Sequence, residues 1–254
     1  MRVRTALTMM TALSGLALAS AAFADQPAAL DAMASMHKPG VYHNFVLETD
    51  LSKRNGVGTG SWDLDGWIGG DVDKLWLKSE GDIAGGKAER AEIWALYSRN
   101  VSAFWDAQAG IRYDIEPDLP PGLPGAKSHS YLTAGVSGLA PYWFETEAHL
   151  FLRDDGAVSA RLRQENEWLL TQKLILKPRI EINLNTRKDS IEGLGTGITD
   201  ASLGLQARYE FRREFAPYLD VAYRQTFGET ANYARTRFES PDETRVSVGI
   251  RWMF

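Results

Sequence analysis

The chain contains no cysteine among its 254 residues, which excludes disulfide bonds and thiolate metal sites. After the N-terminal segment it also lacks any apolar run of about 18 residues, so no transmembrane helix is predicted there. The G-x-S-x-G and H-E-x-x-H motifs of hydrolases and metalloproteases are absent as well. These absences remove several common classes of enzyme and leave a fold to be recognised from its hydrophobic pattern.

The N-terminus has the three parts of a secretory signal peptide. Two arginines precede an apolar run that begins at Ala6, and the segment ends on the A-x-A sequence of residues 22–24. We therefore predict a signal peptide over residues 1–24 and a mature chain that begins at Asp25; a single N-terminal membrane anchor is the alternative. Cleavage would change the formal net charge from −5 to about −7, which argues against nucleic acid as a partner.

Strict alternation of apolar and polar residues recurs along the rest of the chain. In residues 201–211, for example, Leu205 falls on one face, whereas Gln206 and Arg208 fall on the other. Such period-two patterns predict strands with one dry face. About twelve are predicted, at 42–51, 60–69, 74–82, 88–99, 104–115, 130–138, 142–153, 158–170, 174–185, 201–211, 215–227 and 244–254. No stretch has a convincing helical period, although a helix is the alternative for 88–99.

The connections between these strands alternate in length. Short links fall at 70–73, 100–103, 139–141, 171–173 and 212–214, and longer ones rich in Gly, Pro and charge at 52–59, 116–129, 186–200 and 228–242. Short turns on one rim and longer loops on the other are typical of an outer-membrane barrel. For residues 42–254 we predict an all-β fold, an antiparallel up-and-down transmembrane β-barrel of about 12 strands with short periplasmic turns and longer extracellular loops.

The polar strand faces carry Arg or Glu on nearly every strand, which suits a solvated lumen better than the core of a β-sandwich. A closed barrel also satisfies every backbone N–H and C=O group in hydrocarbon. A soluble periplasmic β-sandwich or a lipocalin-like barrel is the alternative. Aromatic residues near strand ends are expected to form interfacial girdles: Tyr142, Trp143, Trp168, Tyr218 and Trp252.

The chain ends on the alternating stretch TRVSVGIRWMF, residues 244–254, with Phe254 as its last residue. A terminal aromatic residue of this kind resembles the C-terminal signal of bacterial outer-membrane proteins. We therefore expect outer-membrane lipids and the barrel-assembly machinery as partners. The expected location is the outer membrane, after signal-peptide cleavage near Ala24.

Several stretches together resemble the copper resistance protein B family of bacterial outer-membrane proteins. They are WDLDGWIGGD (62–71), KLWLKSEG (74–81), LYSR (96–99), FWDAQAGIRYD (104–114), GLAPYWFETEA (138–148), LLTQKLILKPRIE (169–181), REFAPYLDV (213–221) and GIRWMF (249–254). The resemblance runs in order from about residue 43 to the end. It implies an outer-membrane barrel in a copper-tolerance system, with copper as ligand or substrate and a periplasmic multicopper oxidase as a partner. Binding, export and exclusion of copper are all compatible with it.

The chain departs from the family at its leader, where members commonly carry a long tract with repeated Met and His. The predicted periplasmic leader, residues 25–41, holds only Met33, Met36 and His37, and His43 opens the first strand. Thioether and imidazole groups suit Cu(I), so these four residues form a candidate partial site. A leader with incidental methionines is the alternative, and high-capacity copper storage is not expected.

A second candidate metal site lies on the predicted strand 142–153. Glu145, Glu147 and His149 share its polar face, roughly 7 Å between neighbours. Carboxylates on a pore wall favour cations, and these residues are suited to Cu(II). The next strand is expected to add Arg161, Arg163, Glu165 and Glu167. A salt-bridge network that fills and stiffens a narrow barrel is the alternative.

The predicted function is an outer-membrane copper resistance protein that binds copper or mediates its passage or export across the outer membrane. A general or structural porin without copper specificity is the alternative. An enzyme is not expected. An outer-membrane lipase needs a Ser–His pair at the lipid face, whereas His149 is predicted to face inward and His129 is predicted to lie in a Pro/Gly-rich loop.

Overall fold

The computed structural model describes residues 40–54, 56–115, 128–237 and 240–254. Within these ranges the chain forms a 3-10 turn, η1 (Pro141–Trp143), a helix, α2 (Gly228–Thr236), and thirteen strands. The strands are β1 (Tyr42–Arg54), β2 (Val57–Gly69), β3 (Asp73–Ala84), β4 (Lys87–Ser102), β5 (Trp105–Ile115), β6 (His129–Ala140), β7 (Phe144–Arg153), β8 (Val158–Glu165), β9 (Trp168–Leu169), β10 (Leu174–Asn185), β11 (Gly197–Tyr209), β12 (Phe215–Thr226) and β13 (Asp242–Met253). The predicted strands are confirmed, and residues 88–99 belong to strand β4.

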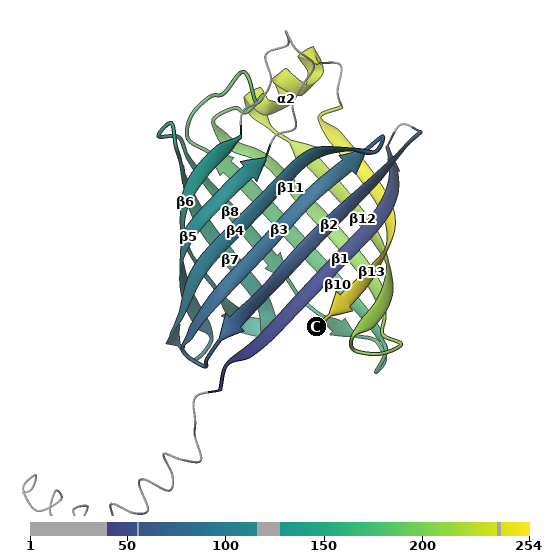
Figure 1. Ribbon diagram of the computed structural model, residues 1–254. Helices are drawn as coiled ribbons and strands as arrows, with labels where there is room; N and C mark the ends of the chain where they lie inside the picture. Colours follow the sequence, from purple (N-terminus) through teal and green to yellow (C-terminus); the bar gives the residue numbers. More distant parts are fainter. Residues whose placement is uncertain (1–39, 55, 116–127, 238–239) are drawn as a thin grey trace, which may run out of the picture. The chain divides into compact units, whose positions relative to one another are not determined.

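The strands pair antiparallel around the barrel in sequence order, and β1 pairs with β13, so the sheet closes on itself (Figure 1). Both β8 and β9 pair with β10 and together form one barrel strand. The interruption between them lies opposite Pro178, whose carbonyl accepts from the N–H of Asn166 but which has no N–H to donate. The fold is therefore a closed barrel of twelve strands, as predicted.

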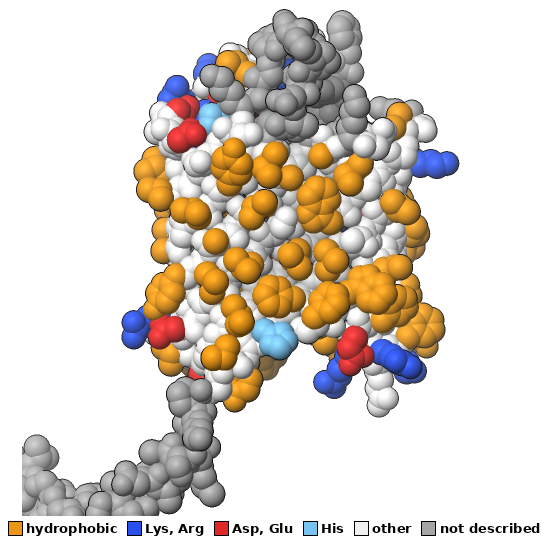
Figure 2. Space-filling view, viewed as in Figure 1, with side chains coloured by type: hydrophobic (Ala, Val, Ile, Leu, Met, Phe, Trp, Pro, Cys, Tyr) orange, Lys and Arg blue, Asp and Glu red, His pale blue; other side chains and the backbone are white. Residues whose placement is uncertain are grey.

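Side chains alternate between the outer surface and the lumen. Leu205 and Val248 point outward and are 45% and 59% exposed, whereas their neighbours Gln206 and Ser247 point inward and are each 1% exposed. Figure 2 shows apolar side chains spread over the visible outer surface, with charged ones gathered toward its two ends. A closed sheet with an apolar exterior presents that exterior to lipid.

The two ends of the barrel differ as predicted. The end that carries α2 and the loop after β10 is called the long-loop rim below, and the end that carries the C-terminus is called the short-turn rim (Figure 1). The predicted long loop at 52–59 is wrong: β1 and β2 continue to a tight turn in which Gly56 takes a φ of 82°. The predicted absence of helix is also wrong, because α2 spans nine residues. No helix in the described ranges is long and apolar enough to cross a membrane.

The short-turn rim departs from the prediction at three aromatic residues. Tyr142 and Trp143 do not begin β7 but lie in η1, with φ of 66° and 64° and exposed side chains. Asn166 Nδ2 donates to the carbonyl of Tyr142 at 2.9 Å and so holds this turn. Tyr218, predicted to belong to an outer girdle, points into the lumen because it shares a face of β12 with buried Asp220.

The seam between β1 and β13 holds the last residue of the chain. The N–H of Phe254 donates to the carbonyl of Phe45 at 2.8 Å, and the N–H of Phe45 donates back at 3.1 Å. Beside them, the rings of Trp252 and Phe215 meet edge to face at 4.8 Å. Phe254 therefore completes the ladder that closes the barrel.

Candidate functional site in the barrel lumen

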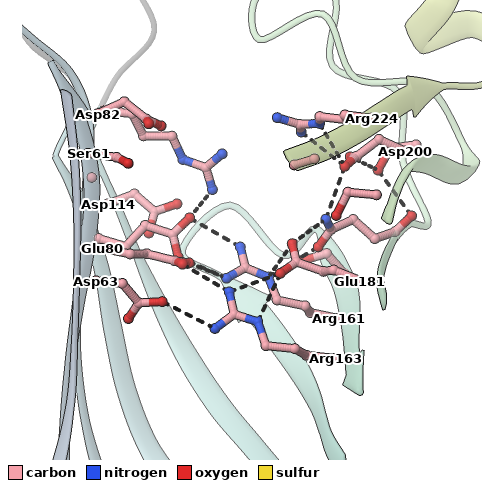
Figure 3. A pocket seen from close by; sticks show the side chains of 18 of the residues that line it. Ser61, Asp63, Glu80, Asp82, Asp114, Arg161, Arg163, Glu181, Asp200 and Arg224 are labelled. Atoms are coloured by element: carbon pink, nitrogen blue, oxygen red, sulfur yellow. Dashed lines mark hydrogen bonds and ion pairs between the residues drawn. The ribbon is translucent and has the colours of Figure 1, made fainter. Parts of the chain in front are cut away.

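The lumen contains a cavity of about 1280 Å³. Charged side chains from nearly every strand line it, and the loops of the long-loop rim contribute Ser190, Ile191, Leu194 and Arg237. Figure 3 shows part of this lining, with Asp63 and Glu80 on one side facing Arg161 and Arg163, which lie beside Glu181 on the other. The lumen is thus a polar chamber inside an apolar shell.

Five adjacent strands place a carboxylate at directly opposed positions of the lumen wall. The register pairs Glu48 with Asp63, Asp63 with Glu80, Glu80 with Glu92, and Glu92 with Asp114. These five residues are called the acidic row below. Directly opposed side chains lie roughly 4.5–5.5 Å apart at Cβ, and like charges at such positions are destabilising. The row therefore depends on cations supplied from elsewhere.

Two arginines of β8 supply part of that charge from across the lumen. Arg161 Nη1 donates to Glu80 at 2.5 Å, and its Nη2 donates to Glu92 at 3.2 Å. Arg163 Nη2 donates to the other oxygen of Glu80 at 3.0 Å but comes only within 3.8 Å of Asp63 (Figure 3). Glu80 is therefore fully engaged, whereas Asp63 keeps a side chain that is 47% exposed.

A third arginine holds the end of the acidic row nearest the long-loop rim. Arg112 donates to both oxygens of Asp114, from Nε at 2.6 Å and from Nη2 at 2.5 Å, and Nη2 lies 2.8 Å from Glu92. Its guanidinium also stacks near the buried rings of Trp94 and Phe151, at 5.3 and 4.8 Å from their centroids. A planar, bidentate and stacked contact of this kind requires arginine rather than lysine.

The opposite end of the acidic row is held more loosely. Glu48 accepts from Gln206 Nε2 at 2.9 Å, and its nearest guanidinium nitrogen, Arg251 Nε, is 3.7 Å away. Within the described residues, Gln206 Oε1, Asp50 Oδ1 and Asp220 Oδ1 are buried without a hydrogen-bond donor. An unpaired buried acceptor costs roughly 1–3 kcal/mol. This part of the wall would therefore be stabilised by a donor or a cation.

The other side of the lumen carries a second row, called the balanced row below. Its directly opposed members are Glu147, Arg163, Glu181, Ser202, Arg224 and Glu243. Charges alternate along most of this row, so neighbours attract; Arg163 Nε, for example, donates to Glu181 at 3.0 Å. This side satisfies much of its charge locally.

Strand β7 sets the three predicted ligands on its lumen face, as the alternation predicted. The neighbouring strand β8 places Glu165, Arg163 and Arg161 directly opposite Glu145, Glu147 and His149. Glu147 is engaged by Lys78, whose Nζ lies 2.6 Å from Glu147 and 2.7 Å from Asp65. Because an ammonium group already neutralises Glu147, a metal ion would have to displace it.

The three predicted ligands do not converge on one point. His149 Nε2 lies 2.8 Å from Gln108 Oε1, and its ring meets Trp94 edge to face at 5.4 Å. Glu145 instead faces Glu165 across the β7–β8 pair. Among the residues that the structure describes, no group of three or more His, Cys, Asp or Glu side chains is arranged to hold a metal ion.

The candidate Cu(I) ligands of the leader and of the start of β1 either lie away from the lumen or fall outside the residues that the structure describes. His43 lies on β1 five residues before the lumen-facing Glu48, so the alternation turns it outward beside exposed Ile68. Met33, Met36, His37 and the predicted cleavage site near Ala24 lie outside the described residues.

A polar cluster at the long-loop rim joins β6, the β7–β8 turn and the loop after β10. His129 Nδ1 lies 2.8 Å from Asp154, and Nε2 lies 3.1 Å from Glu192. Arg153 is 2.6 Å from Asp189 and 2.8 Å from Glu192. The hydrogen bond from His129 lowers the pKa of Asp154, whereas burial raises the pKa of Glu192. Together these contacts anchor the loop after β10 to the barrel wall.

The acidic row was not predicted from the sequence. Its members fall on the polar faces of five predicted strands, but only strand register brings them together. Counting outward from a hairpin in which Arg54 pairs with Val57 brings Glu48 opposite Asp63. The wrong prediction of a long loop at 52–59 concealed this signal.

Comparison with known proteins identifies the family. The family model described as Copper resistance protein B precursor (CopB) matches residues 45–254. This chain belongs to the CopB family. It is 36% identical to "Copper resistance protein B" of Escherichia coli over 87% of this chain and 72% of that protein. It is 40% identical to "Copper resistance protein B homolog" of Pseudomonas syringae pv. tomato over 76% of this chain and 63% of that protein, so it spans less than two thirds of that relative.

Solved structures support the fold. A KdgM porin has a TM-score of 0.51 at 11% identity, covering 83% of this chain and 99% of that chain. A NanC porin has a TM-score of 0.55 at 7% identity, covering 82% and 98%. With the apolar exterior and the family membership, this likeness identifies the CopB family member as an outer-membrane β-barrel. The short-turn rim is accordingly periplasmic and the long-loop rim extracellular.

Proposed function

We propose that this CopB family member supports copper tolerance by binding copper ions and mediating their passage or export across the outer membrane. Membership of the family is the observation that carries the proposal, since the matched relatives are named for copper resistance. The carboxylate-lined cavity of about 1280 Å³ gives the proposal a chemical location in the membrane. The proposed role is binding or transport rather than catalysis.

The proposed ligands fall into two sets that suit different oxidation states of copper. Met33, Met36 and His37 of the leader offer thioether and imidazole groups to Cu(I), with His43 at the periplasmic end of β1. Glu145, Glu147 and His149 offer oxygen and imidazole groups to Cu(II) in the lumen. Because Lys78 and Gln108 already contact Glu147 and His149, copper would bind there by exchanging with these partners.

Deletion of the gene in its own host tests the function directly. We expect lower copper tolerance and altered periplasmic copper content, restored by the wild-type gene. A mature form that begins at Tyr42 should fold but lose much of its Cu(I) affinity, since strand β1 begins there. The triple variant Glu145→Gln/Glu147→Gln/His149→Ala should alter Cu(II) uptake into liposomes. Unchanged tolerance and uptake in every case would exclude the copper role.

A general or structural porin is the second candidate. The observation that favours it is the engagement of Glu147 and His149 by Lys78 and Gln108, which makes the lumen a cross-linked polar network. Such a barrel would conduct ions or small solutes equally with and without copper. Its deletion would leave copper tolerance unchanged while altering permeability to other solutes.

The proposal includes a periplasmic multicopper oxidase as a functional partner, which the family resemblance implies. The two proteins would then act on the same copper pool from the two sides of one compartment. Tolerance of the double deletion would equal that of the more sensitive single deletion. Fully additive losses of tolerance would argue for independent roles.

A further inference from the structure

We propose that the acidic row is a binding track for hydrated divalent metal cations, with its resting position between Glu48 and Asp63. This inference deepens the proposed copper function, on which it rests, by naming hydrated Cu(II) as the ion handled in the lumen. It also moves the expected contact site from β7 to strands β1–β5.

The row is an arrangement that stability alone does not favour. Each of the four successive pairs of opposed carboxylates is destabilised by repulsion between like charges. The balanced row of the same barrel alternates charge and avoids that cost. A wall of carboxylates that spans five strands concentrates cations along itself.

The Glu48–Asp63 pair is the part of the row least occupied by protein cations. Its guanidinium contacts are long, 3.7 Å from Arg251 to Glu48 and 3.8 Å from Arg163 to Asp63. By contrast, the hydrogen bonds that Arg161 donates to Glu80 and Glu92 in the middle of the row are all 3.3 Å or shorter. A cation entering the lumen would therefore meet the weakest competition between Glu48 and Asp63.

A second feature of the same wall also points to a ligand. Gln206 is 1% exposed; its amide nitrogen donates to Glu48, while its Oε1 has no donor among the described residues. Asp50 Oδ1, on the same face of β1 as Glu48, is likewise buried without a donor. Water bound to a metal ion is a strong hydrogen-bond donor. Both side chains line the cavity, so a rotation of the Gln206 amide or the Asp50 carboxylate would turn these acceptors toward the water shell of a cation at Glu48 and Asp63.

The chemistry of the row selects the class of ion. All five side chains offer carboxylate oxygen, which suits hard or borderline divalent cations and not the soft Cu(I) ion. The described residues form no ready cluster for direct coordination, so the ion would keep water ligands. The cavity of about 1280 Å³ beside the row has room for that hydration shell.

The test uses the folded, full-length mature protein in detergent and Cu(II) as the probe. Glu48→Gln/Asp63→Asn removes the proposed resting position. Ser61→Arg adds a guanidinium between Asp50 and Asp82, directly opposite both, and leaves the row intact. The matched control is Ser202→Arg, which adds the same charge to the lumen between Glu181 and Arg224 of the balanced row.

Equilibrium dialysis should show a loss of Cu(II) affinity of roughly tenfold or more for Glu48→Gln/Asp63→Asn and for Ser61→Arg. Ser202→Arg should bind Cu(II) nearly as the wild type does. Electron paramagnetic resonance of the wild-type protein should show oxygen ligands for the Cu(II) that the other two variants fail to bind. Equal binding by all forms, or equal losses from the two arginine variants, would overturn the track. If the double carboxylate variant does not fold, the two arginine variants decide the question.

Failure of the copper function is distinguishable from failure of the track. If the acidic row binds Cu(II) in detergent but deletion of the gene leaves the copper tolerance of the host unchanged, only the copper function is refuted. If the host needs the gene for copper tolerance but the variants of the acidic row bind Cu(II) as the wild type does, only the track is refuted.

Discussion

The two sides of the lumen wall place charge in opposite ways. Along the balanced row, oppositely charged residues such as Arg163 and Glu181 face each other across neighbouring strands. Along the acidic row, carboxylates such as Glu80 and Glu92 face each other instead. The first side is stabilised by its immediate neighbours, whereas the second needs guanidinium groups that reach across the barrel. The difference shows that strand pairing alone does not set the charge balance of this lumen.

This dependence makes β8 the element that connects the two sides. Arg163 belongs to the balanced row by register, yet it also contacts Glu80 of the acidic row. Arg161, two residues earlier, contacts both Glu80 and Glu92. An ion that binds at Glu80 or Glu92 would compete with these two side chains, so ion binding there would be coupled to the contacts that cross the barrel.

The largest expected effect comes from breaking the seam at which the two sides meet. Deleting Phe254 removes the two backbone hydrogen bonds to Phe45 and the terminal aromatic residue. We expect most of the protein to remain unfolded although it is synthesised and exported. Heat-modifiable migration on cold SDS gels measures the folded fraction.

Phe254→Tyr is the matched control, because it keeps both backbone hydrogen bonds and the aromatic ring. It should assemble as the wild type does. Normal heat-modifiability after deletion of Phe254 would show that the terminal residue is dispensable for closure.

The next effect contrasts an arginine that reaches across the lumen to the acidic row with an arginine of the balanced row. Arg161 is 10% exposed and serves the acidic row, whereas Arg224 is 51% exposed and pairs with Asp200 at 3.0 Å. Arg161→Gln should lower the free energy of unfolding by about 3–5 kcal/mol, since it removes three charge-assisted hydrogen bonds to the carboxylates of Glu80 and Glu92. Arg224→Gln should lower it by about 0–1 kcal/mol. Urea titration of the folded barrel in detergent measures both.

Adding Glu80→Gln to Arg161→Gln should restore part of the lost stability, because it removes one of the carboxylates whose negative charge Arg161 helped to balance. The same substitution in the wild-type background should be destabilising. Equal costs for the two arginine variants would mean that the acidic row does not depend on contacts across the lumen.

The fold could be predicted from the sequence far more fully than the lumen. The alternation of apolar and polar residues can be read within a single strand, so it correctly predicted that Val248 faces outward and Ser247 inward. The short links likewise predicted the positions of the turns. It could not reveal the acidic row, because each pairing joins residues on different strands and depends on register. The same limit applied to Tyr218, whose ring enters the lumen over Gly249, where a Cβ atom would lie 2.3 Å from the ring.

A smaller effect compares the lipid face with the lumen. Val248→Arg should destabilise the barrel by roughly 2–4 kcal/mol, the cost of arginine near the bilayer midplane. Ser202→Arg is the lumen control, since Ser202 lines the cavity. Gln206 and Ser247 also face the lumen but are 1% exposed, so arginine at either would be overpacked. Equal damage from Val248→Arg and Ser202→Arg would contradict the assignment of faces.

The smallest effect follows the acidic row to its extracellular end, where Asp114 is directly opposed to His129. Beyond it, side-chain hydrogen bonds from Arg153 and His129 lower the pKa values of Asp155 and Asp154. Such carboxylates stabilise the fold above their unfolded pKa of about 3.9 and lose that contribution as the pH falls through their folded values. Acid should therefore loosen the loop after β10.

The effect of acid on Glu192 has the opposite sign. Because burial raises the pKa of Glu192, its protonation on acidification favours the folded loop and offsets part of the loosening. A spin label at Thr196 should show constant mobility from neutral pH to about pH 4 and rising mobility below it. Asp155→Asn removes an acid-sensitive partner of Arg153, which lies 2.7 Å away, and should flatten the rise. Mobility that already rises when the pH falls from 7 to 5 would contradict control of the loop by the aspartates.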